Sequence, residues 1–144
     1  MKVLVQRCSH AEVRVQGNIV GCIDHGLCLL VGFTEGDDEK KLLKMVEKVL
    51  KLRIFPDENG VMNKSVLDVQ GSILSISQFT LYADTSKGNR PSYMHALRGE
   101  EAIKLYERFN EELQKSIPVE TGIFGSHMEV SLTNMGPTTI LLEM

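Results

Sequence analysis

Near the start of the chain, Val13 and Val15 alternate with polar residues at every second position, which is the period of a β-strand. Turn sequences divide this region into four runs, at residues 2–8, 11–16, 19–23 and 27–33. The separators Gly17-Asn18 and Asp24-His25-Gly26 contain residue types that favour turns. We therefore expect a meander of antiparallel strands, with one face that later elements must cover.

The period changes after the sequence TEGDD at residues 34–38. Apolar residues then recur at helical spacing, at Leu42, Leu43, Val46, Val49 and Leu50. This pattern predicts an amphipathic helix of about 14 residues, with Asp37 or its neighbour as the N-cap. A second amphipathic helix is predicted over residues 99–115, and Pro118 ends it.

The other segments have strand patterns or turn residues. Strands are predicted at residues 51–55, 72–81, 119–124, 127–134 and 138–143, and the PDENG sequence at 56–60 predicts a turn. The element order predicts an α/β fold in which layered antiparallel and mixed sheets form a partial barrel covered by two helices. A length of 144 residues fits one domain, over residues 1–144.

Charge and hydropathy exclude some classes of function. The net charge of −3 argues against a protein that coats nucleic acid by bulk electrostatic attraction. The longest apolar run, LCLLVGF at 27–33, is too short to cross a bilayer, and no signal peptide is visible. We therefore expect a cytoplasmic protein with no membrane partner.

The cysteines do not form a recognisable metal motif. Cys8, Cys22 and Cys28 are odd in number, lack the C-x-x-C spacing and lie in apolar strand patterns, so reduced core thiols are expected. Cys8 and His10 are close enough in sequence to share a metal, but nothing nearby supplies the remaining ligands. No metal and no cofactor is predicted.

Common catalytic motifs are absent, including the nucleophile elbow, the zinc-protease helix and the phosphate-binding loop. The histidines His10, His25, His95 and His127 are scattered, and we expect each on the surface or packed. Hydroxyl groups gather at Ser75, Ser77 and Thr80, but no base lies nearby in the sequence. These hydroxyls therefore have two interpretations, a nucleophile or ordinary strand residues facing water.

Two further features are open to more than one interpretation. The loop YADTSKGNRPSY at 82–93 carries Lys87 and Arg90, which can contact phosphate or simply face solvent. Gly136-Pro137 precedes the last apolar run, where proline fits because it cannot donate to a sheet.

Together these stretches resemble the D-aminoacyl-tRNA deacylase family, also called the D-tyrosyl-tRNA deacylase family. SQFTL at 77–81, KGNRPSY at 87–93, GIFGSHMEVSLTN at 122–134 and Gly136-Pro137 carry the resemblance over essentially the full length. It implies a homodimer with the active site at the interface, where SQFTL of one chain faces a Gly-cisPro turn of the other. The implied substrate is a D-amino acid esterified to the 3′-terminal adenosine of tRNA, which the enzyme hydrolyses.

The resemblance also implies roles for individual residues. The backbone amides of Phe79 and Thr80 would hold the oxyanion while the substrate's 2′-OH assists the water, so that Thr80 positions rather than attacks. The implied substrate-binding residues are Ser77, Gln78, Phe124, Met128, Gly136 and Pro137. Lys87 and Arg90 would contact tRNA phosphates.

Selectivity in such a site would come from exclusion, because rigid main chain leaves no room for an L side chain. A pocket of this kind cannot reject a substrate without Cβ, so glycyl-tRNA is also expected to be cleaved. Family members commonly have Asp and Val where this chain has Met135 and Thr138. A related branch with Gly-Thr at the turn tolerates some L-amino acids, and Pro137 argues against that branch.

Three alternatives stay open at this stage. The same groove could belong to a non-catalytic module that binds the tRNA end. Thr80 could be the nucleophile of an esterase that acts on small substrates. The chain could also be a structural interaction protein.

Overall fold

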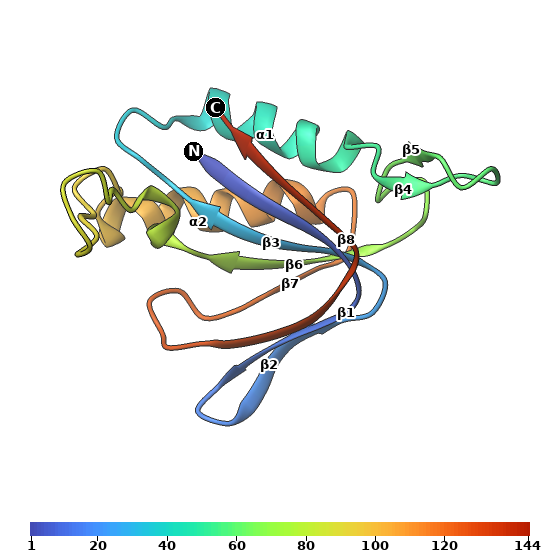
Figure 1. Ribbon diagram of the computed structural model, residues 1–144, viewed down its shortest axis with the longest axis horizontal. Helices are drawn as coiled ribbons and strands as arrows, with labels where there is room; N and C mark the ends of the chain where they lie inside the picture. Colours follow the sequence, from blue (N-terminus) through green and yellow to red (C-terminus); the bar gives the residue numbers. More distant parts are fainter.

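A single mixed sheet organises the computed structural model, which describes residues 1–144. Its strands run in the order β2-β1-β3-β6-β7, and β8 pairs with the free edge of β1 (Figure 1). The strand bounds are Lys2–Val15 (β1), Asn18–Ile23 (β2), Gly26–Gly32 (β3), Ser72–Ser77 (β6), Val119–Thr121 (β7) and Glu129–Glu143 (β8). The two ends of the chain lie side by side because β8 runs antiparallel along β1.

The N-terminal region is not the predicted meander. Residues 2–15 form one strand, β1, and both β2 and β3 pair with it rather than with each other. The polar Ser9-His10 pair suggests the end of a strand in the sequence. In the structure β1 continues through these residues, and its pairing with β8 shifts register there. A continuous β1 can therefore belong to two layers of the fold.

Two helices connect parallel strands. The helix α1 (Glu39–Lys51) lies between β3 and β6 in the sequence, and α2 (Gly99–Gln114) lies between β6 and β7. The Asp38 side chain caps α1 by accepting a hydrogen bond from the Lys41 amide at 2.9 Å, as the sequence predicts. Neither α-helix is long and apolar enough to cross a membrane.

The core has two parts because β1 curves from one layer into the other. Its first half contributes Val3 and Val5 to a large cluster beneath both helices. Its second half contributes Ala11 and Val13 to a smaller cluster against β6. On β2, a Cβ added to Gly21 would lie 2.8 Å from the Thr121 carbonyl of β7, so the sheet nearly closes on itself. The predicted partial barrel with two covering helices is confirmed.

Several predicted strands differ from the observed ones. The predicted strand at 51–55 does not form, because Lys51 is the last residue of α1 and only Phe55 of this segment lies in a strand. That short strand, β4 (Phe55–Pro56), pairs with β5 (Met62–Lys64). The predicted strand 119–124 is confined to β7. The predicted strands 127–134 and 138–143 are one strand, β8, which contains Gly136-Pro137.

The predicted strand 72–81 also stops early. It ends at Ser77, and a 3₁₀ turn, η1 (Phe79–Tyr82), follows. The alternation of Leu74 and Ile76 with Ser75 and Ser77 stops at the polar Gln78, and a Cβ on Gly32 would lie 2.8 Å from the Gln78 carbonyl. The glycine allows the backbone of η1 to approach β3 closely.

Candidate active site

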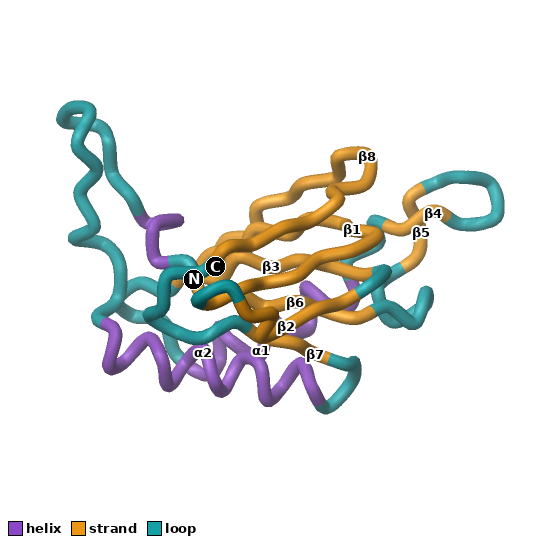
Figure 2. Tube along the Cα trace, turned by 90° about the horizontal axis from the view of Figure 1, so that it is seen from below, coloured by secondary structure: helices purple, strands orange, loops and turns teal.

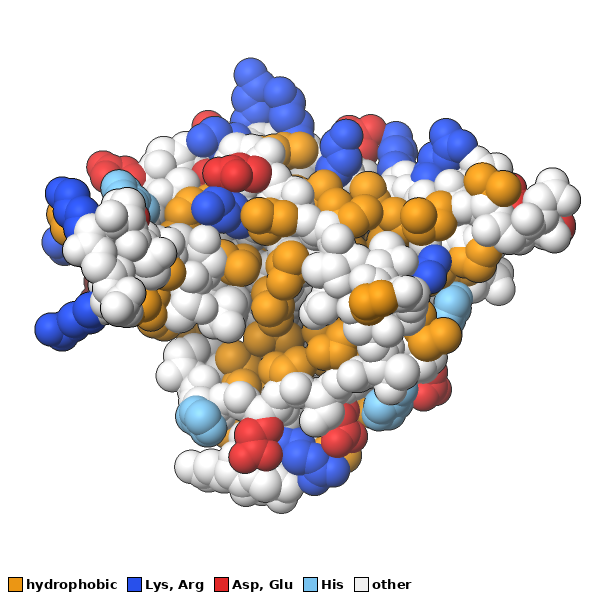
Figure 3. Space-filling view, viewed as in Figure 1, with side chains coloured by type: hydrophobic (Ala, Val, Ile, Leu, Met, Phe, Trp, Pro, Cys, Tyr) orange, Lys and Arg blue, Asp and Glu red, His pale blue; other side chains and the backbone are white.

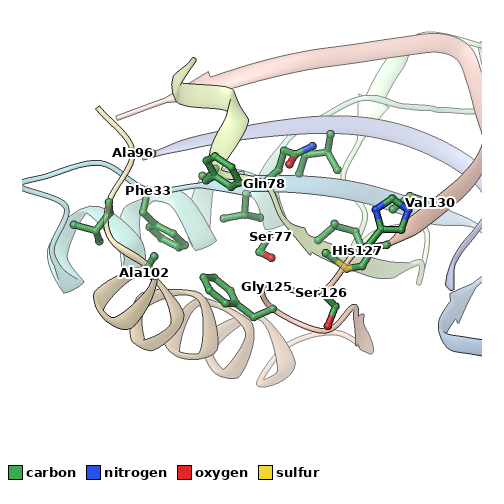
Figure 4. Close-up of a pocket in the computed structure, with 18 of the residues that line it drawn as sticks. Phe33, Ser77, Gln78, Ala96, Ala102, Gly125, Ser126, His127 and Val130 are labelled. Carbon is green, nitrogen blue, oxygen red and sulfur yellow. The ribbon is translucent and has the colours of Figure 1, made fainter. Parts of the chain in front are cut away.

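A cavity of about 830 Å³ opens beside the ends of β3 and β6. The first turn of α2, residues 124–128 and the start of β8 complete its wall. In Figure 4, Ser77 stands near the centre, with Phe33 and Ala102 on one side and His127 and Val130 on the other. Hydrophobic side chains line a hollow at the centre of the face in Figure 3.

Half of the residues predicted for the site meet in this cavity. Ser77, Gln78, Phe79, Phe124 and Met128 all line it, although they come from segments more than 40 positions apart. Thr80, Lys87, Arg90, Gly136 and Pro137 do not line it.

The cavity wall contains no Asp, Glu, Lys, Arg or Cys residue. Its titratable side chains are His127 and Tyr93. His127, which we expected on the surface or packed, is exposed and lies on the cavity wall. No neighbouring acidic residue lines the cavity to orient it, in contrast to the usual base of a nucleophile triad.

Backbone N–H groups at the start of η1 are available to a ligand. Phe79 and Thr80 occupy the first two positions of η1, where amides have no partner inside the helix. The backbone hydrogen bonds outside helices and strands include none donated by either amide. The preceding Gln78 amide is fixed by the Val31 carbonyl at 2.7 Å, so the turn is anchored to β3.

An aromatic pair stands at the rim of the cavity. The rings of Phe79 and Tyr93 meet edge to face, with centroids 5.0 Å apart and an interplanar angle of 71°. Phe79 is 56% exposed even with this partner. A large exposed ring beside an apolar cavity is suited to stacking with a planar ligand.

The predicted hydroxyl cluster does not form. Ser75 is fully buried, and its carbonyl accepts a hydrogen bond of 2.8 Å from the Tyr106 hydroxyl. Burial raises the pKa of Tyr106, which therefore stays protonated as a donor at neutral pH. Ser77 faces the cavity, whereas Thr80 lies outside it, so the three hydroxyls have separate environments.

Gly136-Pro137 projects from β8 instead of opening a new strand. On β1, Gln6 faces Thr139 and Cys8 faces Asn134, so residues 135–138 stand opposite the single residue between them. Figure 2 shows this projection beside the β8 label. The Gly136-Pro137 peptide bond is cis, both residues are exposed, and neither borders the cavity of its own chain.

Arg7 and Asn134 support this projection, and the sequence analysis missed both. Arg7 Nη1 donates to the Ile54 carbonyl at 2.7 Å, and Nη2 donates to the Met135 carbonyl at 3.2 Å. The Asn134 side-chain amide donates to the carbonyls of Arg7 and Thr138 at 3.0 and 2.9 Å. Arg7 is far from this turn in the sequence, so no local pattern could have revealed the contact.

Lys87 and Arg90 lie at the tip of the loop that follows η1. The Asp84 and Ser92 backbones exchange hydrogen bonds of 2.8 and 2.9 Å, which close the base of this loop. Both basic residues are exposed, and neither takes part in an ion pair within the chain. Lys and Arg side chains are visible at the left edge of the molecule in Figure 3, where this loop lies in Figure 1.

Residues 4–143 match the family described as D-Tyr-tRNA(Tyr) deacylase. The chain belongs to the D-Tyr-tRNA(Tyr) deacylase family. A protein named D-aminoacyl-tRNA deacylase from Anoxybacillus flavithermus is 55% identical over 144 residues, which cover 99% of both chains. Another of that name, from Lactobacillus delbrueckii subsp. bulgaricus, is 52% identical over 145 residues and covers 100% of both chains.

Solved structures of similar proteins have the same fold. One described as a c-Myc DNA Unwinding Element Binding Protein is 42% identical, has a TM-score of 0.95, and covers 100% of this chain and 99% of its own. Another, a probable eukaryotic D-amino acid tRNA deacylase, is 17% identical with a TM-score of 0.85 over 99% and 98% of the two chains. Membership of the deacylase family confirms the identification from sequence, and with it the expectation of an ester-hydrolysing enzyme.

Proposed function

We propose that this protein, as a single domain, hydrolyses the ester between a D-amino acid and the 3′-terminal adenosine of tRNA. The observation that carries the proposal is the pair of unengaged amides at Phe79 and Thr80 beside an apolar cavity, in a chain of the deacylase family. Such a site can bind a planar base and stabilise negative charge. It does not need a cofactor for this reaction.

Hydrolysis begins when water attacks the ester carbonyl. Negative charge develops on the carbonyl oxygen, and the Phe79 and Thr80 amides stabilise it, a contribution of about 10²–10³ in rate for each donor. The neighbouring 2′-OH of the terminal ribose assists the water, which fits a cavity wall without a carboxylate. Collapse of the intermediate breaks the bond between the acyl carbon and the 3′-oxygen, which takes up a proton to become the 3′-OH of the tRNA, and the D-amino acid is released.

The cavity also offers a place for the terminal adenine. Phe79, Phe124 and Met128 present two aromatic rings and a thioether to the same space. Aromatic and sulfur-containing side chains pack well against the face of a base. Ser77 and Gln78 supply polar groups to the same wall and shape the pocket for the aminoacyl end.

The selectivity turn comes from the second subunit of a homodimer in this proposal. Support comes from the Gly136-Pro137 projection, which is exposed, fixed by Arg7, and separate from the cavity of its own chain. Placed against the partner's SQFTL segment, its carbonyls would receive the substrate's α-amino group. The rigid backbone would then collide with an L side chain and leave room for a D side chain or for glycine.

Contacts with tRNA beyond its terminus are few. The basic tip at Lys87 and Arg90 is free to bind phosphate, and it lies on the loop that carries Tyr93 to the cavity rim. Few phosphate contacts suit an enzyme that must release its product, and they are compatible with a net charge of −3.

The experiment that tests this function follows free amino acid released from D-tyrosyl-tRNA by the purified protein. The proposal predicts release of D-tyrosine with intact tRNA as the other product. A module that only binds the tRNA end would protect the ester and slow its spontaneous hydrolysis. A Thr80-nucleophile esterase would turn over D-tyrosine ethyl ester, which has no adenosine, and would accumulate an acyl-enzyme.

A further inference from the structure

Metal-binding side chains gather on the hairpin formed by β1 and β2, away from the cavity. One ligand atom each from His10, Glu12 and Cys22 lies within 4.8 Å of the other two. Cys8, the thiol that the sequence places nearest to His10, is fully buried. Cys22 is exposed, in contrast to the expectation of three core thiols, and it takes the place of Cys8.

Strand pairing explains why these residues meet. His10 and Glu12 are two positions apart on β1 and share a face, and Cys22 of β2 stands directly opposite Glu12. Directly opposite residues on antiparallel strands have Cβ atoms about 4.5–5.5 Å apart. Ala11 and Val13 alternate with them and point into the core, so the backbone holds the three side chains on the outer face.

Each ring nitrogen of His10 faces a carboxylate. Its Nε2 faces Glu12 Oε2 at 3.8 Å, and its Nδ1 faces Asp24 Oδ1 at 3.6 Å. Metal-ligating histidines usually donate their other ring N–H to a carboxylate, and Asp24 lies on that side of the ring, just beyond hydrogen-bond distance. The second carboxylate oxygen of Glu12 is held by Arg14 Nε at 3.2 Å, which leaves Oε2 for a metal.

We propose that His10 Nε2, Glu12 Oε2 and Cys22 Sγ form a site for a divalent transition metal of the Zn²⁺ type. Imidazole, carboxylate and thiolate are the ligands such ions prefer, and water would complete a tetrahedron. Tetrahedral coordination needs ligand atoms about 3.3–3.5 Å apart, which follows from Zn–N and Zn–S bonds of about 2.0 and 2.3 Å. Exposed His10 and Cys22 can close the remaining gap by small side-chain rotations.

The other thiols do not compete for the ion. Cys8 and Cys28 are both buried in the smaller core cluster, away from the outer face that carries the proposed ligands. When the metal binds, the Cys22 thiol loses its proton to solvent and the thiolate forms the bond to the ion.

The site is separate from the proposed deacylation. Val130 and Leu132 of β8, which border the cavity, pair with Val13 and Ala11 on the core side of β1. The metal ligands lie on the opposite face, so the bound ion ties β1 to β2 without entering the cavity. A structural rather than catalytic role follows.

Titration of the tag-free, chelator-treated protein with Co²⁺ tests the site. We expect one Co²⁺ per chain, with the near-ultraviolet charge-transfer band of a thiolate ligand and the visible bands of a tetrahedral ion. Cys22→Ser should abolish the charge-transfer band, and His10→Ala should weaken binding at least tenfold. Asp24→Asn should weaken it less than His10→Ala does, because Asp24 is not a ligand and its side chain is 97% exposed.

Matched controls keep the result clear. His95→Ala removes another exposed histidine and should leave the Co²⁺ affinity unchanged. All the substituted side chains are exposed, so these variants should fold, which circular dichroism can verify. Absence of the thiolate band from the wild-type protein, or its persistence in Cys22→Ser, would overturn the proposal whatever the deacylation activity.

Discussion

Arg7 Nη2 donates a hydrogen bond of 3.2 Å to the carbonyl of Met135, the residue just before Gly136-Pro137. The other arm of the same guanidinium donates to the Ile54 carbonyl at 2.7 Å. One planar side chain therefore joins the projection on β8 to the segment that precedes β4. In the proposed function, this contact sets where the selectivity turn points.

Replacement of Arg7 by lysine tests that role. Lysine keeps the charge but cannot reach both carbonyls with a planar fork, so one hydrogen bond to a charged group is lost. Such a bond contributes about 1.5–3 kcal/mol, and we expect kcat/KM for D-tyrosyl-tRNA to fall by roughly 10–100-fold. A drop in the melting temperature with unchanged kcat/KM would assign Arg7 a purely structural role.

Gly136→Ala should distort the backbone of the same turn. Gly136 has a φ of +110°, and an added Cβ would lie 2.8 Å from Thr138 Oγ1 and 3.0 Å from Arg7 Nη2. We expect the free energy of unfolding to fall by about 1–3 kcal/mol, as for other residues forced into disfavoured backbone regions. Deacylation should fall by more than the loss of folded protein explains.

Gly60→Ala is the matched control for that variant. Gly60 also has a positive φ, +76°, but an added Cβ would meet nothing within 4 Å, and the residue is remote from the cavity wall. Unfolding experiments in urea should show a loss of stability without a change in kcat/KM. Equal effects of the two substitutions on kcat/KM would remove the special role of the 136–137 turn.

Thr80→Ala should retain most of the activity, because Thr80 acts through its backbone amide and its side chain lies outside the cavity. A tRNA ending in 2′-deoxyadenosine should react far more slowly, because it lacks the assisting hydroxyl. Single-turnover release of amino acid measures both rates. Isolation of an acyl-Thr80 enzyme would contradict the mechanism.

His127→Ala separates this mechanism from one with a side-chain base. The imidazole lines the cavity, and general-base catalysis typically contributes 10²–10⁴ in rate. The proposal expects a loss of less than about tenfold, since a side-chain base is not needed. A larger loss, with a changed pH profile of kcat, would show that His127 rather than the 2′-OH assists the attacking water.

The double variant Lys87→Ala/Arg90→Ala should bind tRNA with a smaller dependence on salt. Each phosphate contact removed lowers the slope of log Kd against log salt by about 0.7–0.9, so a reduction of about 1.4–1.8 is expected for the two. Lys48→Ala, on the exposed face of α1, is the control and should leave the slope unchanged. An unchanged slope in the double variant would show that the loop is only a solvated connection.

Sequence patterns predicted the parts of this fold that depend on local periodicity. Both helices were predicted, with the cap at Asp37 or its neighbour, because apolar spacing and capping are local properties, and the cap is Asp38. The continuity of β1 across Ser9 and His10 could not be predicted, because it depends on its pairing with β8. The early end of β6 likewise depends on a close approach to Gly32.

The same distinction applies to the candidate site. Ser77, Gln78 and Phe79 were predicted together because they lie in one short motif that resembles the family, and all three line a cavity with Phe124 and Met128. Arg7 contacts a turn 128 residues away, and no periodicity encodes such a contact. The exposure of Cys22 depends on which face of β2 packs inward, which a short strand does not reveal.

Parallel hydrolysis of D-tyrosyl-tRNA and L-tyrosyl-tRNA by the wild-type protein, with glycyl-tRNA as a third substrate, tests the central claim most directly. The account predicts that the D ester is cleaved at least roughly 100-fold faster than the L ester, while glycyl-tRNA is also cleaved. Comparable rates for the two tyrosyl esters, or resistance of glycyl-tRNA under conditions that clear D-tyrosyl-tRNA, would contradict it.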